Sequence, residues 1–154
     1  MNSLSEPSLA QDGSKLRLRF WLGLLKTSRM VENTVRERLR RQFDTTLPRF
    51  DVMAMLAKSG NGLKMSDLSS QLMVSNGNVT GIIDRLVSDG LVMRVSIKGD
   101  RRATLVRLTA RGAAEFGNMA KAHEDWVAEL FSGLTDAEID RTIATLTQIR
   151  KART

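Results

Sequence analysis

Cysteine is absent from this chain of 154 residues, and histidine occurs only once. Without cysteine the chain has no disulfide bonds, no thiol catalysis and no thiol redox sensing, and a structural zinc site is not expected. No apolar run approaches the length of a membrane span. The N-terminal segment MNSLSEPSLAQDGS is polar and carries acids before any base, unlike a signal peptide. We therefore expect a cytoplasmic protein with no metal, no cofactor and no membrane partner.

Sequence motifs that mark enzymes are also missing. The chain has no glycine-rich phosphate loop, no nucleophile elbow and no cluster of metal ligands. Carboxylates such as Asp84 and Asp89 are expected to point in different helical directions, so they do not form a catalytic pair. The sequence therefore argues against an enzyme.

What the chain has in excess is positive charge. Its 24 lysines and arginines against 17 acids give a formal net charge of +7 and a pI of about 10.5. This favours a polyanionic partner, nucleic acid first and an acidic membrane surface second. The charge is uneven, because residues 85–111 are strongly basic while residues 112–154 hold more acids than bases. The pattern predicts a basic binding face on a separate scaffold.

The spacing of apolar residues predicts a mainly α-helical single domain with a small β-hairpin, preceded by a flexible tail over residues 1–14. Gly90 suits a helix C-terminus, and Glu138 can complete a capping box with Thr135. Four residues suit helix N-termini, namely Ser66, Ser75, Thr109 and Thr135. The expected helices cover 15–43, 48–58, 66–72, 75–90, 110–131 and 136–151, and the expected strands cover 91–97 and 103–109, joined by a turn at 98–102.

The segment SNGNVTGIIDRLVSDG predicts a helix with one buried stripe and an unusual exposed face. The stripe consists of Val79, Ile82, Ile83, Leu86 and Val87. The other face begins with small uncharged residues, although glutamate and lysine would favour the helix more. Such side chains can approach phosphates and base edges closely. With the preceding helix MSDLSSQL this gives a helix-turn-helix, whose DNA-binding candidates are Ser75, Asn76, Asn78, Thr80 and Arg85.

The basic segment SIKGDRRATLVRLTARG follows directly and would add a wing. Arg101 and Arg102 would reach the DNA backbone or a narrow minor groove, which attracts arginine. Asp100 could orient Arg102 by a charge-assisted pair. The alternative is a surface salt bridge of little energetic value.

The run VSNGNVTGIIDRLVSDGLVMR…DRRATLVRLTARG resembles the multiple antibiotic resistance regulator (MarR) family of winged helix-turn-helix repressors. The Asp-x-Arg wing motif of that family falls on Asp100 and Arg102, and its Leu-Thr-x-x-Gly on residues 108–112. The resemblance covers about residues 15–151. It implies an obligate homodimer on a pseudopalindromic operator, with dimerisation helices in 15–43 and 110–151 and the winged helix-turn-helix in 46–109. It also implies small phenolic or aromatic ligands that relieve repression.

Two segments suggest a branch within that family. LPRFDVMAML and LMVSNGNVTGIIDRL are similar to regulators of aromatic acid breakdown, including those that respond to hydroxycinnamoyl-CoA thioesters. The resemblance thus implies an aromatic acid or an aromatic acyl-CoA as the effector.

The residues independently predict a dimer. One small lobe cannot easily bury an apolar series near the C-terminus, made of Leu130, Phe131, Leu134, Ile139, Ile143, Leu146 and Ile149. A twofold dimer would bury it and set two recognition helices about one DNA turn apart.

A cleft between the first helix, the Phe50 helix and the Ala110 helix is the candidate effector site. Its predicted lining residues are Trp21, Arg29, Phe50, Met53 and His123, whose rings, thioether and charge suit an aromatic acid. The alternative is that the apolar ones are core. The run VRERLRRQF is open to three interpretations: a solvated face, a DNA contact or a site for an anionic ligand.

Together these features predict a ligand-responsive transcriptional repressor. The alternative is a non-specific architectural DNA-binding protein that responds to no ligand. The polar face without lysine argues against it, because lysines would serve phosphate-only binding better.

Overall fold

The computed structural model describes the backbone of residues 9–72 and 76–153, and the side chains of all of these except 9–12, 76–77 and 101–103. In chain order the elements are α1 (Leu9–Phe43), α2 (Leu47–Lys58), β1 (Leu63–Lys64), α3 (Met65–Leu72), α4 (Asn76–Ser88), β2 (Val92–Ile97), β3 (Asp100–Leu108), α5 (Ala110–Leu130) and α6 (Asp136–Lys151). The predicted mainly α fold with a small β-wing is confirmed. α1 begins six residues earlier than predicted, so part of the segment interpreted as a tail is helical.

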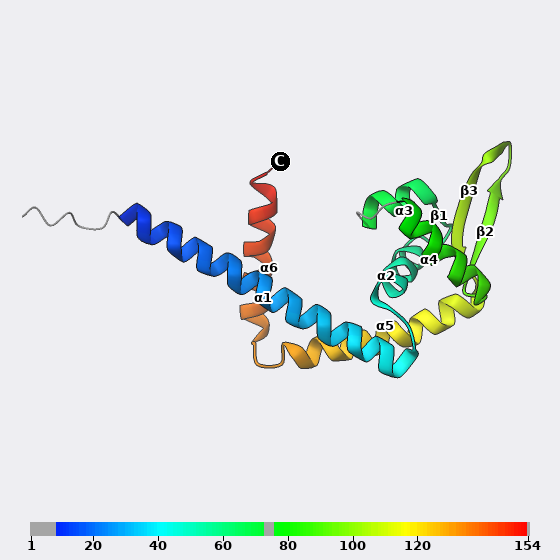
Figure 1. Cartoon of the computed structure of the whole chain (residues 1–154). Helices are drawn as coiled ribbons and strands as arrows, with labels where there is room; N and C mark the ends of the chain where they lie inside the picture. The colour runs from blue at the N-terminus through cyan, green and yellow to red at the C-terminus, as the bar shows by residue number, and fades with distance from the viewer. Residues whose placement is uncertain (1–8, 73–75, 154) are drawn as a thin grey trace, which may run out of the picture.

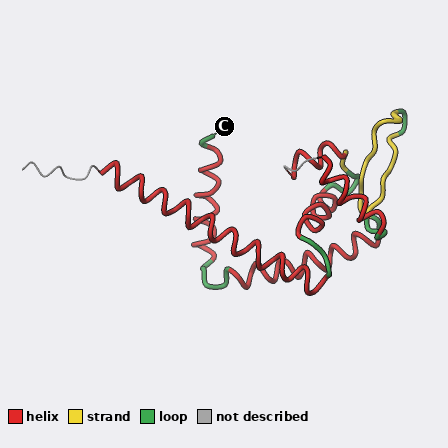
Figure 2. Tube along the Cα trace, in the orientation of Figure 1, coloured by secondary structure: helices red, strands yellow, loops and turns green. Residues whose placement is uncertain are grey.

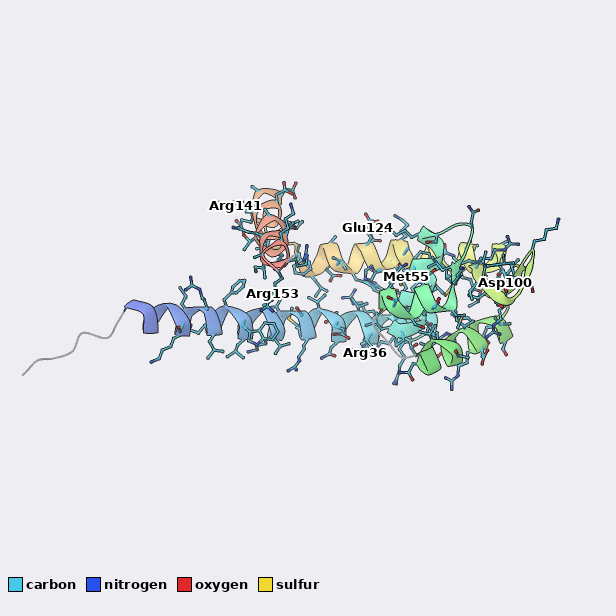
Figure 3. The ribbon with its side chains drawn as sticks, turned by 90° about the horizontal axis from the view of Figure 1, so that it is seen from above. Arg36, Met55, Asp100, Glu124, Arg141 and Arg153 are labelled. Atoms are coloured by element: carbon cyan, nitrogen blue, oxygen red, sulfur yellow. The ribbon has the colours of Figure 1, made fainter. Side chains whose placement is uncertain are left out.

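The elements form a compact lobe with long helices leading away from it. Figure 1 shows α2, α3, α4 and the sheet gathered at one end, with the β2–β3 hairpin projecting from the lobe. α1 and α5 lie beneath the lobe and lead away from it, and the N-terminal half of α1 extends far beyond (Figure 2). Figures 1 and 3 together show α6 standing apart from α1. None of the described helices is both long and apolar enough to cross a membrane.

A single apolar core joins the lobe to the long helices. α2 supplies Phe50, Val52, Met53 and Leu56, and α4 supplies Val79, Ile83 and Leu86, all buried. Val35 and Leu39 of α1 and Met119 and Trp126 of α5 pack into the same core. The predicted apolar stripe of α4 is confirmed, with Ile82 and Val87 partly buried at its edges.

Local chemistry sets most helix ends where the sequence predicts them. Thr109 caps α5 by accepting a hydrogen bond from the Gly112 N–H at 3.0 Å, and Thr135 caps α6 by accepting from the Glu138 N–H at 3.2 Å. Gly90, with φ 75°, follows the end of α4, and the N–H groups of Gly90 and Leu91 donate back to the last turn. Ser66 is not an N-cap, because α3 begins at Met65, directly after β1. Ser75 lies outside the described residues.

The hairpin turn is tighter than the sequence suggests. The sheet is antiparallel in the order β1-β3-β2, and its β2–β3 register ends with Ile97 opposite Asp100. Only Lys98 and Gly99 therefore form the turn, with Gly99 at φ 95°. The predicted turn over residues 98–102 is wrong, because residues 100–102 already belong to β3. The two-residue strand β1 was not predicted.

Candidate nucleic-acid interface

α4 presents an exposed polar face opposite its buried stripe. Asn78, Thr80, Gly81 and Arg85 are exposed, while Val79 and its apolar neighbours on the stripe lie in the core. The described part of this face carries no charge before Asp84. The predicted open face is thus present for Asn78, Thr80 and Arg85. The backbone of Asn76 begins the helix, but its side chain and all of Ser75 lie outside the described residues.

Two ion pairs fix α4 to the rest of the lobe. Asp84 pairs with Arg94 of β2, which ties the middle of α4 to the wing. Asp89, just after α4, pairs with Arg49 of α2 at 2.5 Å. The Arg49 side chain is only 21% exposed, so this pair is less screened by solvent than a surface pair. Neither pair was predicted from the sequence. The partners are separated by 10 positions in the first pair and by 40 positions in the second, and they meet only in the tertiary fold.

Three basic residues of the wing, Lys98, Arg101 and Arg102, lie in or close after the turn of the hairpin. Lys98 and Asp100 are exposed at the tip, which Figure 1 shows projecting from the lobe. The backbone of Arg101 and Arg102 lies in β3, directly after the turn. Their side chains lie outside the described set, so the Asp100–Arg102 pair remains a prediction.

The predicted effector residues fall into two separate groups. Phe50 and Met53 are buried, and the ring of His123 lies 4.9 Å from that of Phe50. Trp21 is 52% exposed on the projecting part of α1, and Arg29 is exposed on the same helix. At a rise of about 1.5 Å per residue, Trp21 lies roughly 20 Å from the first buried α1 residue, Val35. One protomer alone therefore does not gather all five residues around one space.

A cavity and a partly buried carboxyl lie near the group formed by Phe50, Met53 and His123. Met53 borders a cavity of about 330 Å³, whose other lining residues include Arg49, Asp89 and Arg111. The junction of α1, α2 and α5 also holds Asp51. Burial, together with nearby Glu32, raises the pKa of that carboxyl, and His123 opposes the rise. The junction therefore combines buried rings with a titratable, partly desolvated polar group.

Apolar surface is left uncovered on the long helices. α6 has no buried residue, and Ile143 and Ile149 are exposed along it. An apolar groove of about 670 Å³ lies between α5 and α6, lined in part by Phe131, Leu134 and Leu146. The projecting part of α1 exposes Leu16, Leu18, Phe20, Trp21 and Leu22. Such contiguous apolar surface is typical of a protein–protein interface.

Known proteins share both the fold and its sequence pattern. A model of the MarR family matches residues 45–104. The chain is 30% identical over 122 residues to the HTH-type transcriptional repressor IacR of Pseudomonas putida, covering 79% of this chain and 71% of IacR. A MarR family transcriptional regulator from Silicibacter pomeroyi superposes with a TM-score of 0.78 and 31% identity over 93% of this chain and 99% of that one.

A third comparison includes DNA. A mutant of MarR from E. coli, complexed with operator DNA, superposes with a TM-score of 0.72 and 26% identity. The match covers 94% of this chain and 99% of that one.

Proposed function

The chain belongs to the MarR family of transcriptional regulators, dimeric proteins that bind operator DNA, and on that premise we propose that it is a ligand-released repressor. It would bind a pseudopalindromic operator as a homodimer and leave it on binding an aromatic acid or an aromatic acyl-CoA. The observation that carries the proposal is the exposed face of α4, which is small and polar where an ordinary solvated helix is charged.

DNA recognition would divide between base reading and backbone contact. With α4 in the major groove, Asn76, Asn78 and Thr80 would face base edges, and Arg85 would contact a phosphate. Arg101 and Arg102 on the wing would reach the backbone or the minor groove, with Asp100 orienting Arg102. The ion pairs to Arg94 and Arg49 would hold α4 at a fixed angle to the wing and to α2.

Dimerisation would cover the apolar surface of the long helices. The projecting part of α1 exposes large side chains that its own lobe does not reach, and α6 exposes a second apolar face. A second copy related by a twofold axis would bury both and place the second α4 for the other operator half-site.

An aromatic acid would suit the polar and apolar groups at the junction of α1, α2 and α5. The cavity beside Met53 has a volume within the range of small-ligand sites. Arg49 and Arg111 on its wall could pair with a carboxylate or with CoA phosphates. The ligand would release DNA only through a difference in its affinity for the DNA-bound and free arrangements of the dimer.

DNA binding is tested first by fluorescence anisotropy with a duplex selected from a random library and with a scrambled duplex of equal length. Asn78→Ala should narrow the gap between the two affinities, because it removes a base contact. Arg85→Ala should weaken both and flatten the salt dependence. Arg102→Ala should cost about 1–3 kcal/mol on the selected duplex. If the wild-type protein binds both duplexes equally at every salt concentration, the architectural alternative is correct.

The effector is tested on the preformed protein–DNA complex. Free hydroxycinnamic acids, their CoA thioesters and free CoA are titrated separately, with calorimetry on the protein alone. Release by thioesters only supports the acyl-CoA branch, and release by free acids only supports an aromatic acid. If none of these compounds binds at millimolar concentration, the aromatic effector is rejected while the DNA-binding role stands.

A further inference from the structure

A second polar feature lies beside α4, on the side away from the wing. It is a cleft of about 720 Å³ between α4, the start of α2 and the C-terminal end of α1. Four arginines and one acid lie among its lining residues, which are Arg36, Arg40, Asp44, Thr45, Thr46, Leu47, Pro48, Arg49, Asn78, Gly81, Ile82 and Arg85. We call it the arginine cleft.

The two long walls of the arginine cleft are helix faces. Arg36 and Arg40 are spaced by four residues, so they lie on one face of the last turns of α1, and Asp44 lines the cleft just after the helix ends. Asn78 and Arg85 form the facing stripe of α4. Figure 3 shows Arg36 on the edge of α1 that faces α4, whereas Glu124 of α5 points to the opposite side. The cleft therefore shares two residues with the proposed DNA-reading face.

Positive charge in the arginine cleft is incompletely neutralised. Arg36 pairs with Glu32 at 2.9 Å, and Arg49 pairs with Asp89. Arg40 and Arg85 lie on opposite walls of the cleft, and neither forms an ion pair with another described residue. The first turn of α2 contains no acid, so its N-terminal dipole adds to the positive potential. The cleft thus offers at least two guanidinium groups to an anion.

We propose that the arginine cleft holds one phosphodiester strand of the operator, so that α1 contacts DNA as well as the partner protomer. The inference rests on the proposed function, because a helix in the major groove is flanked by two backbones. The wing lies along one side of α4, and the arginine cleft lies along the other. Arg40 and Arg85 contact phosphates of that strand from opposite walls, as a charge-based and sequence-independent clamp.

A small aromatic anion is the competing occupant, since the volume also falls within the range of ligand sites. The backbone fits the geometry better. The cleft lies directly along the exposed stripe of α4, so a DNA strand flanking that helix must pass over it. Its cations also stand on both walls, which suits a strand carrying several phosphates, whereas one bidentate arginine suffices for a single carboxylate.

Asp44 offers a second way to change the charge of the arginine cleft. Within the described part of the chain it is the only acid that lines the cleft, and its φ of 50° is in the left-handed region. Asparagine tolerates this conformation as well as aspartate does. Asp44→Asn therefore removes one negative charge without new backbone strain.

The first arm of the test compares Arg40→Gln with Arg41→Gln in the full-length protein. Arg41 is the next residue on α1, is exposed, pairs with Glu37 and does not line the cleft. Glutamine and arginine have similar helix propensities, so both variants should fold alike, as circular dichroism can check. Arg40→Gln should lower the slope of log Kobs against log salt by about 0.9 per protomer, or about 1.8 per dimer. Affinity at 0.1 M salt should fall about eightfold per contact on selected and scrambled duplexes alike. Arg41→Gln should change the affinity less than twofold.

The second arm compares Asp44→Asn with Glu37→Gln, which adds the same charge on α1 outside the cleft. Asp44→Asn should tighten binding to both duplexes several-fold, and Glu37→Gln should not. If the cleft variants and their controls change DNA affinity equally, the arginines act only by long-range electrostatic attraction, and the proposal is wrong. Unchanged DNA binding by Arg40→Gln would also overturn the proposal. If that variant then fails to bind 4-hydroxycinnamate, the cleft is a site for a small anion. If the wild-type protein binds no duplex, the proposed function itself fails.

Discussion

Gly112 offers a sharp test of how α5 is joined to the DNA-binding lobe. It is the third residue of α5, where the helix backbone lies against the turn between α4 and β2. A Cβ at this position would lie 1.9 Å from the Leu91 carbonyl oxygen and 2.8 Å from the carbonyl carbon. The atoms in the way are backbone, so no side-chain rotation can relieve the clash. Space, rather than backbone conformation, therefore requires glycine here.

Gly112→Ala must push the start of α5 away from Leu91, and the cost follows from what holds that junction. The Thr109 N–H donates to the Leu91 carbonyl at 3.0 Å, and the Thr109 hydroxyl donates to the Gly90 carbonyl at 2.7 Å. Losing both costs about 1–3 kcal/mol, and overpacking adds about 1–3 kcal/mol. Alanine returns about 1 kcal/mol of helix propensity. The net loss should be about 3 kcal/mol, or roughly 6–12 °C in Tm for a chain of this size.

Gly117→Ala is the matched control on the same helix. Nothing lies within 4 Å of a Cβ built at Gly117, so this variant should gain about 0.5–1 kcal/mol from helix propensity. Urea denaturation followed by circular dichroism, at one protein concentration for all variants, measures both changes. A Gly112→Ala variant as stable as the wild type would refute the close packing of α5 on the turn. Equal destabilisation by both variants would point to α5 as a whole instead.

Three further outcomes follow from the described contacts. Burial and nearby Glu32 raise the pKa of Asp51 while His123 opposes them, so the folded protein holds this proton more tightly than the unfolded chain does. Asp51→Asn should therefore raise Tm near neutral pH. The gain in Tm should vanish as the pH falls from the pKa of Asp51 in the folded protein to its pKa in the unfolded chain, and a gain that grows in acid would contradict a raised pKa. Ile143 is 54% exposed in one protomer, so Ile143→Glu should leave the fold intact. The variant should dissociate the dimer and abolish operator binding, and a dimer at micromolar concentration in sedimentation equilibrium would contradict this prediction. Thr135→Ala removes the hydrogen bond to the Glu138 N–H and should cost about 1 kcal/mol in urea denaturation, whereas Thr135→Ser should restore it.

Features coded by a few neighbouring residues could be predicted from the sequence. The buried stripe of α4, the threonine caps of α5 and α6 and the glycine after α4 all depend on local spacing and chemistry. The hairpin turn could not be placed in the same way. Arg101 and Arg102 are as compatible with a turn as with a strand. In the structure they belong to β3, at a shift in the β2–β3 register between Ser96 and Ile97, and such an irregularity has no signal in the local sequence.

The candidate site was predictable only where it lies on one helix. The polar face of α4 follows from helical periodicity, but the arginine cleft depends on how the end of α1 approaches α4 across α2. The sequence showed the run VRERLRRQF as basic without showing which arginines face α4. Periodicity indicates that Phe50 and Met53 are buried, as the structure confirms, but it does not show which buried residues border a cavity. Met53 borders one because of how α2 packs against α5.

α1 is the element that connects the proposed roles of this chain. It is one continuous helix of 35 residues. Its N-terminal half exposes apolar side chains, and its C-terminal part turns Val35 and Leu39 into the core and supplies Arg36 and Arg40 to the cleft from another face. Because a helix transmits position rigidly, the crossing of the two copies of α1 in a dimer fixes the distance between the two arginine clefts as well as between the two copies of α4. DNA held between α1 and α4 would then select one angle between these helices. A ligand at the junction of α1, α2 and α5 that favours another angle must lose affinity in the DNA complex by the same factor by which it weakens DNA binding. Regulation would therefore need no change within α4 itself, only a different placement of α1 beside it.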